Sequence, residues 1–225
     1  MFSPTWPPPA RAAGEVQAWL VALPLDVEPA LAELSAAERE RAGRFAFAPD
    51  RRRFVWSRLA LRALLGPVEL ALEPRGKPYV AGGPGFSLAH AGAWALVAIA
   101  DGPVGCDLEP PRDLPDLPGM ARLVMAPAEL EAWQQLAGDA RVRAFYRAWT
   151  RKEALLKARG DGFLAEPRGA EVGVEPGAVR EVVLDGVPWA LRDLRPGAPG
   201  LAAVAVPAGP SLVVRTLSLP AGLLS

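Results

Sequence analysis

Residues 93–109 read AWALVAIADGPVGCDLE, and this stretch sets the middle of the fold. Ala93 to Ala100 is an apolar run, which is typical of a buried strand. Asp101-Gly102 is a turn signal, and Val104 to Glu109 has the length of a short strand. We therefore predict a central hairpin that ends at Pro110-Pro111.

Two helices are predicted before this hairpin. Ser35-Ala-Ala-Glu38 is a capping-box pattern, in which the serine caps an exposed N–H group and the glutamate reaches back, and it opens a helix to about Phe47. Asp50 is then placed to cap a second helix that runs through Leu65. Both helices are rich in arginine.

Two more helices are predicted after the hairpin. Pro127 suits the first turn of a helix that ends at Gly138. Asp139 then caps a long helix to about Arg159, which Gly160 closes.

Strands are predicted near both ends of the chain. Trp19 to Leu25 has the composition of a strand that Pro24 interrupts. Three short apolar runs near the C-terminus are expected to form a sheet: Glu181 to Leu184, Ala202 to Val206 and Leu212 to Leu217. Strands, helices and strands in this order indicate an α+β fold.

The composition excludes several classes of function. The chain carries 25 basic and 25 acidic residues, so it lacks the basic excess that a non-specific nucleic-acid binder needs. One cysteine, Cys106, and one histidine, His90, cannot form an internal disulfide or a Cys/His zinc site. The run of residues 93–100 is far shorter than the roughly 20 residues that cross a bilayer, and no secretory signal is visible. We expect a soluble, cytoplasmic protein without nucleic-acid or membrane partners.

Acidic side chains occur at positions where their negative charges would destabilise the fold unless they are balanced. Side chains alternate along a strand, so Asp107 and Glu109 project from one face. They would repel each other unless a positive group lies between them. Gly105 is on the same face and is expected to leave room for a bulky anion. Cys106 points the other way, as a small core residue rather than a nucleophile. The alternative is an ordinary solvated strand end.

A third carboxylate lies on the predicted long helix. Phe145, Trp149 and Leu156 share one helical face, and Glu153 falls near the middle of that stripe. A glutamate on an apolar stripe is unfavourable unless it is paired, protonated or bound to a metal. The alternative is a weak pair with Lys157, four residues later.

Asp107, Glu109 and Glu153 together would suit a hard cation such as Mg²⁺, which keeps several waters and bridges substrate phosphates. Mn²⁺ is the open alternative. The candidate cations for binding phosphate are Lys77, Arg41, Arg53, Lys157 and His90. For each of these arginines the alternative is a solvated charge, and a lone histidine can be purely structural.

Four motifs carry a family resemblance: Gly76-Lys77-Pro78, Phe86 to Trp94 (FSLAHAGAW), Val104 to Glu109 (VGCDLE) and Phe145 to Lys157 (FYRAWTRKEALLK). In order and spacing they resemble the motifs of Sfp-type 4′-phosphopantetheinyl transferases. The pattern W-x-x-K-E-A-x-x-K in the last motif is specific, whereas V-G-x-D-x-E carries weight only beside it.

The resemblance implies a monomer with two similar α+β lobes, residues 1–102 and 103–225, and an active site in the cleft between them. It implies transfer of 4′-phosphopantetheine from coenzyme A to a serine of an apo acyl or peptidyl carrier protein, with release of 3′,5′-ADP. Two rival functions remain open: a catalytically idle carrier-binding module of the same fold, and a Mg²⁺-dependent pyrophosphatase.

The resemblance also implies roles for the acidic set. Asp107, Glu109 and Glu153 match the ligands of the Mg²⁺ that grips the pyrophosphate. Lys157 matches a lysine near that pyrophosphate. The catalytic base would be Glu153 or a metal-bound water that it orients.

The remaining matches concern the nucleotide. Arg53 and His90 match residues that contact the 3′-phosphate of coenzyme A. Lys77 matches a residue beside the nucleotide, and Arg41 aligns with a lysine that contacts phosphate.

Overall fold

The computed structural model describes residues 10–160, 167–177, 180–194, 200–209 and 213–218. Its elements, in chain order, are β1 (Glu15–Ala22), the 3₁₀ turn η1 (Leu31–Glu33), α1 (Ala36–Gly43), α2 (Ala48–Leu65), β2 (Ala71–Leu72), β3 (Pro78–Tyr79), β4 (Gly85–Ala91), β5 (Trp94–Ala100), β6 (Gly105–Glu109), α3 (Leu117–Val124), α4 (Pro127–Gln134), α5 (Gly138–Arg159), the 3₁₀ turn η3 (Pro167–Gly169), β7 (Arg180–Leu184), β8 (Val187–Leu194), β9 (Leu201–Pro207) and β10 (Val213–Ser218). The predicted α+β class is confirmed.

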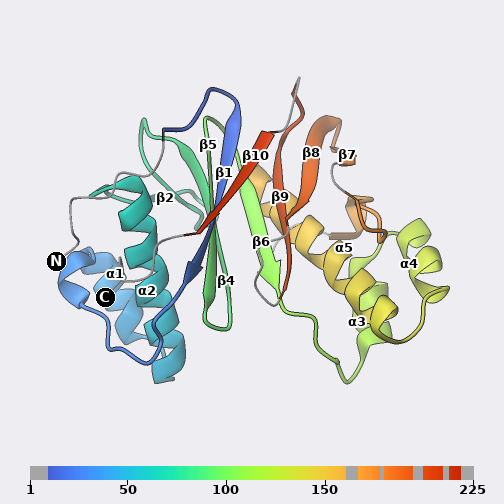
Figure 1. The fold of residues 1–225 in the computed structure, drawn as a ribbon, viewed down its shortest axis with the longest axis horizontal. Helices are drawn as coiled ribbons and strands as arrows, with labels where there is room; N and C mark the ends of the chain where they lie inside the picture. Colours follow the sequence, from blue (N-terminus) through green and yellow to red (C-terminus); the bar gives the residue numbers. More distant parts are fainter. Residues whose placement is uncertain (1–9, 161–166, 178–179, 195–199, 210–212, 219–225) are drawn as a thin grey trace.

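Two four-stranded sheets form the centre of the molecule (Figure 1). The first has the order β10-β1-β5-β4, in which β1 and β10 are parallel and the other pairs antiparallel. The second has the order β6-β9-β8-β7 and is antiparallel throughout. The short pair β2-β3 stands apart from both sheets.

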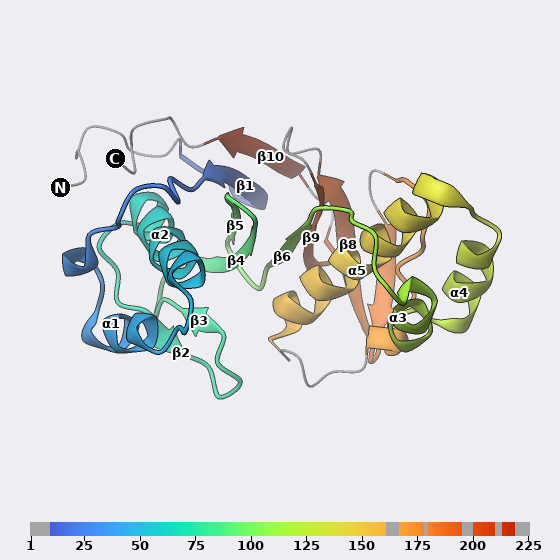
Figure 2. The ribbon, with the colours of Figure 1, turned by 90° about the horizontal axis from the view of Figure 1, so that it is seen from below.

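The alternation of side chains along the strands builds three apolar layers. On β5, Val97 faces the core shared with α2, whereas Leu96 faces the core between the two sheets. On β9, Val204 joins that middle core, whereas Ala203 packs with Leu155 of α5. The order of layers is therefore α2, first sheet, second sheet and α5, and Figure 2 shows α2 and α5 on opposite flanks.

The predicted central hairpin is wrong. β5 pairs with β1 and β4, whereas β6 pairs with β9 in the other sheet. The hairpin is instead formed by β4 and β5, joined through Gly92, which has a φ of 55°. Residues 101–104 carry the chain from one sheet to the other. Cys106 is buried in the middle core, as predicted.

The four predicted helices are all present but wrong at several ends, and a fifth helix, α3 (Leu117–Val124), was not predicted. The capping box of Ser35 and Glu38 is present, but α1 ends at Gly43 rather than Phe47. α2 begins before Asp50, with Phe47 at its N-cap. The first of these helices ends early because residues 44–47 (RFAF) turn the chain before α2 begins at Ala48.

The later helices differ in the same way. α4 begins at Pro127 as predicted but ends at Gln134, and Gly138 opens α5 instead of closing α4. Asp139 therefore lies inside the first turn of α5 rather than at its cap. Gly160 does end α5, in the left-handed conformation with a φ of 86°.

The strand at the start of the chain lies at 15–22, so Pro24 follows it instead of interrupting it. The predicted C-terminal sheet is divided. β7 and β9 share one sheet with β8, a strand that the apolar runs did not indicate, whereas β10 pairs with β1 in the first sheet. Leu212 lies outside the described residues. The expected division of the chain between residues 102 and 103 stays a prediction. β10 belongs to the second half of the chain but pairs with β1 of the first half. Among the described residues, no helix has the length and apolarity to cross a membrane.

Candidate active site

A cationic pocket of about 500 Å³ lies between the first sheet, α2 and the end of α5. Basic side chains from five parts of the chain line it: Arg41, Arg58, Arg75, Lys77, His90 and Lys157. Phe45 and Phe54 form an aromatic part of the wall, with their ring centroids 5.3 Å apart. A concave site that gathers cations next to aromatic rings suits a phosphate-bearing ligand with a planar group.

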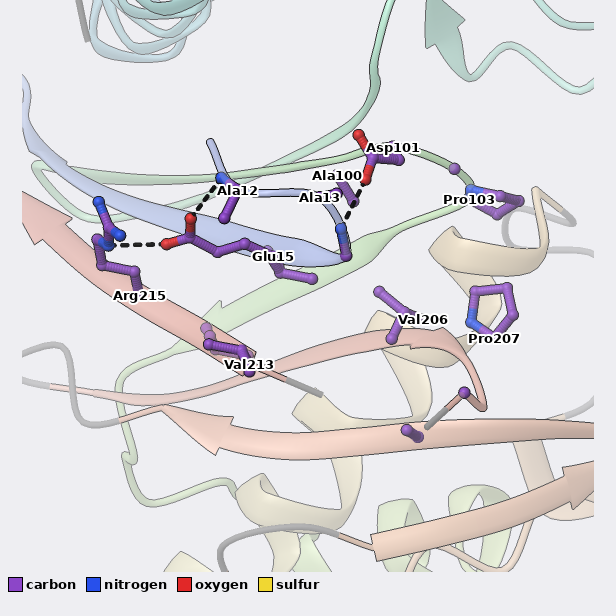
Figure 3. Close-up of a pocket in the computed structure, with 16 residues that line it drawn as sticks. Ala12, Ala13, Glu15, Ala100, Asp101, Pro103, Val206, Pro207, Val213 and Arg215 are labelled. Atoms are coloured by element: carbon purple, nitrogen blue, oxygen red, sulfur yellow. Dashed lines mark hydrogen bonds and ion pairs between the residues drawn. The ribbon is translucent and has the colours of Figure 1, made fainter. Parts of the chain in front are cut away.

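A larger cavity of about 690 Å³ lies elsewhere, where β1 and β10 meet β8 and β9 (Figure 3). Its carboxylates already have partners, either an arginine or backbone amides. Glu15 accepts from the Arg215 Nε atom at 2.7 Å and from the Ala12 amide at 2.9 Å, and Asp101 accepts from the Gly14 amide at 2.8 Å. None of the predicted site residues lines this cavity. The smaller, cationic pocket is therefore the candidate site.

Buried ion pairs fix α5 in place. Arg151 makes a two-pronged pair with Asp193 of β8, with both N–O distances 2.8 Å. On the next residue, the Lys152 ammonium lies 2.7 Å from the Glu129 carboxylate of α4, and both side chains are 1% exposed. Buried pairs of this kind need full hydrogen bonding, and Glu129 also accepts from the Val172 amide at 2.6 Å. The W-x-x-K-E-A-x-x-K segment thus anchors the helix that presents Glu153.

Gly105 does not leave room for an anion, contrary to the prediction. A Cβ atom at this position would lie 1.9 Å from the Ala154 carbonyl oxygen and 2.3 Å from the Ala158 nitrogen. The space is filled by the backbone of α5. Because strand and helix approach so closely here, the face of β6 that carries Asp107 lies directly against α5.

That approach joins the acidic set to the pocket. The Lys157 Nζ atom lies 2.6 Å from the Asp107 Oδ1 atom, so the lysine that lines the pocket pairs with the strand carboxylate. The predicted positive group near Asp107 and Glu109 is therefore Lys157. The weak helical pair between Glu153 and Lys157 is not the main contact of this lysine.

The pKa shifts of the three carboxylates reflect their burial and, for Glu109 and Glu153, repulsion from the neighbouring carboxylates. Burial raises the pKa of Glu109, and the charges of Asp107 and Glu153 raise it further. Burial and the charge of Asp107 also raise the pKa of Glu153, although Lys157 opposes this. Burial raises the pKa of Asp107 as well. Burial disfavours the charge of Lys157, but the carboxylate of Asp107 outweighs this and raises its pKa.

The donor set fits a divalent cation. The second oxygen of Asp107, Oδ2, is buried and has no hydrogen-bond partner among the described residues. An unsatisfied carboxylate oxygen beside two repelling carboxylates is the environment that a hard cation would stabilise. Within the ranges that the structure describes, however, no three acidic, histidine or cysteine side chains are already close enough to form a metal site. Lys157 holds the position beside Asp107.

Of the other predicted residues, some line the pocket and one does not. His90 and Arg41 line the pocket, and the Arg41 guanidinium lies 5.5 Å from the centre of the Phe54 ring. Arg53 is not among the lining residues. Its guanidinium pairs with Asp50 at 2.8 Å and donates to the Gly92 carbonyl at 3.0 Å.

Lys77 has an unexpected environment. Lys77 lines the pocket, but its ammonium donates to the Lys157 carbonyl at 2.7 Å and to the Val104 carbonyl at 3.2 Å.

Several pocket residues escaped the sequence analysis. Arg58 is buried beside Glu38, at 3.6 Å, and burial lowers its pKa to about 10. The Ser57 hydroxyl and the Arg58 Nε atom are buried without hydrogen-bond partners among the described residues. Both line the pocket. The only signal for Arg58 was its place in an arginine-rich helix, which does not show which arginines turn inward.

Comparison with known proteins gives a consistent result. A family model described as 4′-phosphopantetheinyl transferase superfamily matches residues 103–193. The 4′-phosphopantetheinyl transferase HetI of Nostoc sp. is 35% identical over 230 residues, which cover 92% of this chain and 95% of that protein. The chain belongs to the 4′-phosphopantetheinyl transferase superfamily.

Other members of the superfamily are similar over part of their length. A 4′-phosphopantetheinyl transferase of Bacillus subtilis is 28% identical over 143 residues, covering 59% of this chain and 63% of that protein. The 4′-phosphopantetheinyl transferase AcpT of Salmonella typhimurium is 36% identical over 115 residues, covering 48% of this chain and 60% of that protein. The family predicted from the four motifs is confirmed.

Proposed function

We propose that the protein transfers the 4′-phosphopantetheine group of coenzyme A to the serine of an apo acyl or peptidyl carrier protein and releases 3′,5′-ADP. Membership of the superfamily supports the reaction. The observation that carries the assignment to this site is the position of Lys157. Lys157 lines the cationic pocket, and its ammonium pairs with Asp107 of the acidic set.

The pocket suits the nucleotide part of coenzyme A. That part carries a 3′-phosphate, a pyrophosphate and an adenine ring, so it needs cations at two places and a flat apolar surface. Arg41, Arg58 and His90 would bind phosphate, and the Phe45–Phe54 wall would contact the base. Arg53 would act electrostatically on the neighbouring His90 rather than by direct contact, since its charge lowers the pKa of His90.

Asp107, Glu109 and Glu153 would hold Mg²⁺, with Mn²⁺ as a substitute. When bound, the cation would neutralise charge on the pyrophosphate oxygens. Lys157 would release Asp107 to the cation and move its ammonium toward the pyrophosphate. This exchange is local, because the lysine already touches both the pocket and Asp107.

The chemistry follows from the residues around the pyrophosphate. The carrier serine attacks the β-phosphorus, and the bond between that phosphorus and the bridging oxygen of the pyrophosphate breaks. The departing 3′,5′-ADP takes the electron pair, and Lys157 stabilises the developing charge. Glu153 accepts the proton of the serine hydroxyl. Burial raises its pKa, which makes its carboxylate a stronger base than an ordinary glutamate.

We further propose that the two halves, residues 1–102 and 103–225, act as two lobes with the active site at their junction. β4 of the first sheet and β6 of the second meet there, and the Cys106 amide donates to the Ser87 hydroxyl at 3.1 Å. The protein would act as a monomer, because one chain supplies both the pocket and the acidic set. It would work in the cytoplasm.

The direct test is a labelling reaction with a fluorescent coenzyme A analogue, Mg²⁺ and a panel of apo carrier proteins from fatty-acid, polyketide and nonribosomal-peptide synthesis. Each carrier is paired with its serine-to-alanine variant. We expect label on at least one carrier and none on its variant. Release of 3′,5′-ADP without a carrier would indicate a pyrophosphatase, and carrier binding without label would indicate an idle module.

A further inference from the structure

We infer that Lys77 is a positioning residue, whose ammonium ties the start of β6 to the last turn of α5 and so sets the distance between the two halves of the acidic set. This inference rests on the proposed function. It concerns a residue whose match to the family suggested a nucleotide contact instead.

The acceptors of Lys77 identify what it joins. The Val104 carbonyl immediately precedes β6, and the Lys157 carbonyl lies in the last turn of α5. The last four carbonyls of a helix lack partners within the helix. One of them, the Leu156 carbonyl, accepts a hydrogen bond from the Gly160 amide. The Lys77 ammonium donates a hydrogen bond to the next carbonyl, that of Lys157. The helix dipole also favours a positive charge at this end of the helix.

The turn that presents Lys77 is itself fixed. The Glu73 amide donates to the Lys77 carbonyl, and the Gly76 amide donates to the Glu73 carbonyl, both at 2.8 Å. Gly76 has a φ of 85°, which only a glycine adopts easily. The G-K-P motif therefore delivers an ammonium to one defined place.

That place adjoins the closest contact of β6 with α5. Gly105 follows Val104 and packs on Ala154 and Ala158. Lys157 follows in the same helix turn and contacts Asp107. A small shift of β6 against α5 would change the spacing between Asp107 and Glu109 on the strand and Glu153 on the helix.

The use of the ammonium favours this role over a nucleotide contact alone. Lys77 has three donor hydrogens, and two of them have carbonyl acceptors among the described residues. Burial lowers the pKa of Lys77, so these acceptors also replace part of its lost hydration.

The test compares K77M, which keeps the apolar stem and removes the donors, with K77R, which keeps a cation that donates. R75M is the matched control, because Arg75 lines the same pocket from the same turn. Three quantities are measured: kcat and the coenzyme A KM in the carrier reaction, Mn²⁺ affinity without coenzyme A, and amide hydrogen exchange of peptides covering 104–109 and 150–160.

We expect K77M to lower kcat and Mn²⁺ affinity by about 10- to 100-fold, as loss of a supporting contact around a metal site does. Exchange in both peptides should become faster, while the coenzyme A KM changes little. K77R should restore most of kcat. R75M should raise the coenzyme A KM and leave exchange unchanged. If K77M folds poorly, K77Q should fall between K77M and the wild type.

The inference is overturned if the wild type is active and K77M raises only the coenzyme A KM, with kcat, Mn²⁺ affinity and exchange as in the wild type. If the wild type labels no carrier, the proposed function fails instead. The exchange comparison still decides the role of Lys77 in that case, because it needs no turnover.

Discussion

Gly105 of β6 packs so closely on Ala154 of α5 that a Cβ atom at position 105 would lie 1.9 Å from the Ala154 carbonyl oxygen. This contact holds a strand of the second sheet against the helix that carries Glu153. It also brings Asp107, two residues along the strand, to the Lys157 ammonium. The acidic set therefore depends on a residue that has no side chain.

The substitution G105A should damage both stability and turnover. The backbone of α5 cannot move away cheaply, so we expect a loss of about 1–3 kcal/mol in the free energy of unfolding, as for other overpacked sites. A displacement near 1 Å at the acidic set should lower kcat by about 100-fold. Urea unfolding and the labelling assay measure the two effects.

G102A is the matched control. Gly102 lies three residues earlier, and an added Cβ would meet nothing within 4 Å. Its stability and turnover should be close to those of the wild type. Equal behaviour of G105A and G102A would show that the contact with α5 does not position the site.

Features that neighbouring residues determine could be predicted from the sequence. The Ser35–Glu38 capping box and the Gly160 helix end are of this kind, because their hydrogen bonds are made within a few residues. The alternation that places Asp107 opposite Cys106 also follows from the strand alone. These local rules were enough to nominate Asp107, Glu109 and Glu153 as candidate ligands, which stays a prediction.

Features that distant residues determine could not be predicted. β6 pairs with β9 rather than β5, because the partner of a strand depends on how whole sheets pack. The burial of Arg58 depends on Glu38 of α1, which reaches it only in the folded chain. The Lys77 ammonium likewise finds carbonyls 27 and 80 residues away.

Glu153 is expected to be required for turnover but not for folding. E153Q keeps the size of the side chain and removes both the charge and the base, so labelling of the carrier should be lost. Because burial and Asp107 raise the pKa of Glu153, its charged form destabilises the fold above the unfolded pKa. The melting temperature of E153Q at neutral pH should therefore equal or exceed that of the wild type.

Glu131 of α4 supplies the control for this prediction. It is exposed and is not among the residues that line the pocket, so E131Q should label the carrier normally. Turnover by E153Q at the rate of E131Q would remove Glu153 from the role of base.

Coenzyme A binding should depend on pH through His90. Partial burial and the charges of Arg53 and Lys157 lower the pKa of the free side chain below 6.5. A bound phosphate would raise that pKa, so binding takes up a proton. Affinity should be highest at acidic pH and fall as pH rises through the pKa of the complex. Calorimetric titration with 3′,5′-ADP at several pH values measures this.

H90A should lose most of that pH dependence and raise the coenzyme A KM, with kcat largely retained. A lower kcat with an unchanged KM would instead place His90 at the reacting atoms. An unchanged pH dependence in H90A would assign the proton uptake to another group.

Cys106 should be inert in the folded protein. Its side chain is buried, and burial raises the pKa of the thiol to about 11. At pH 8 only about 0.1% of it would be thiolate. Iodoacetamide should therefore label the denatured chain and spare the native one, as mass spectrometry would show. Fast labelling of the native protein with loss of transfer would contradict this.

The central claim is that carboxylates from β6 and α5 share one divalent cation beside the cationic pocket. Titration of the protein with Mn²⁺, followed by the electron paramagnetic resonance of the free ion, tests this without turnover. We predict one site per chain in the wild type and in E131Q, with binding strongly weakened in D107N, E109Q and E153Q alike. Wild-type binding by E153Q, with loss confined to the two strand variants, would contradict a shared site.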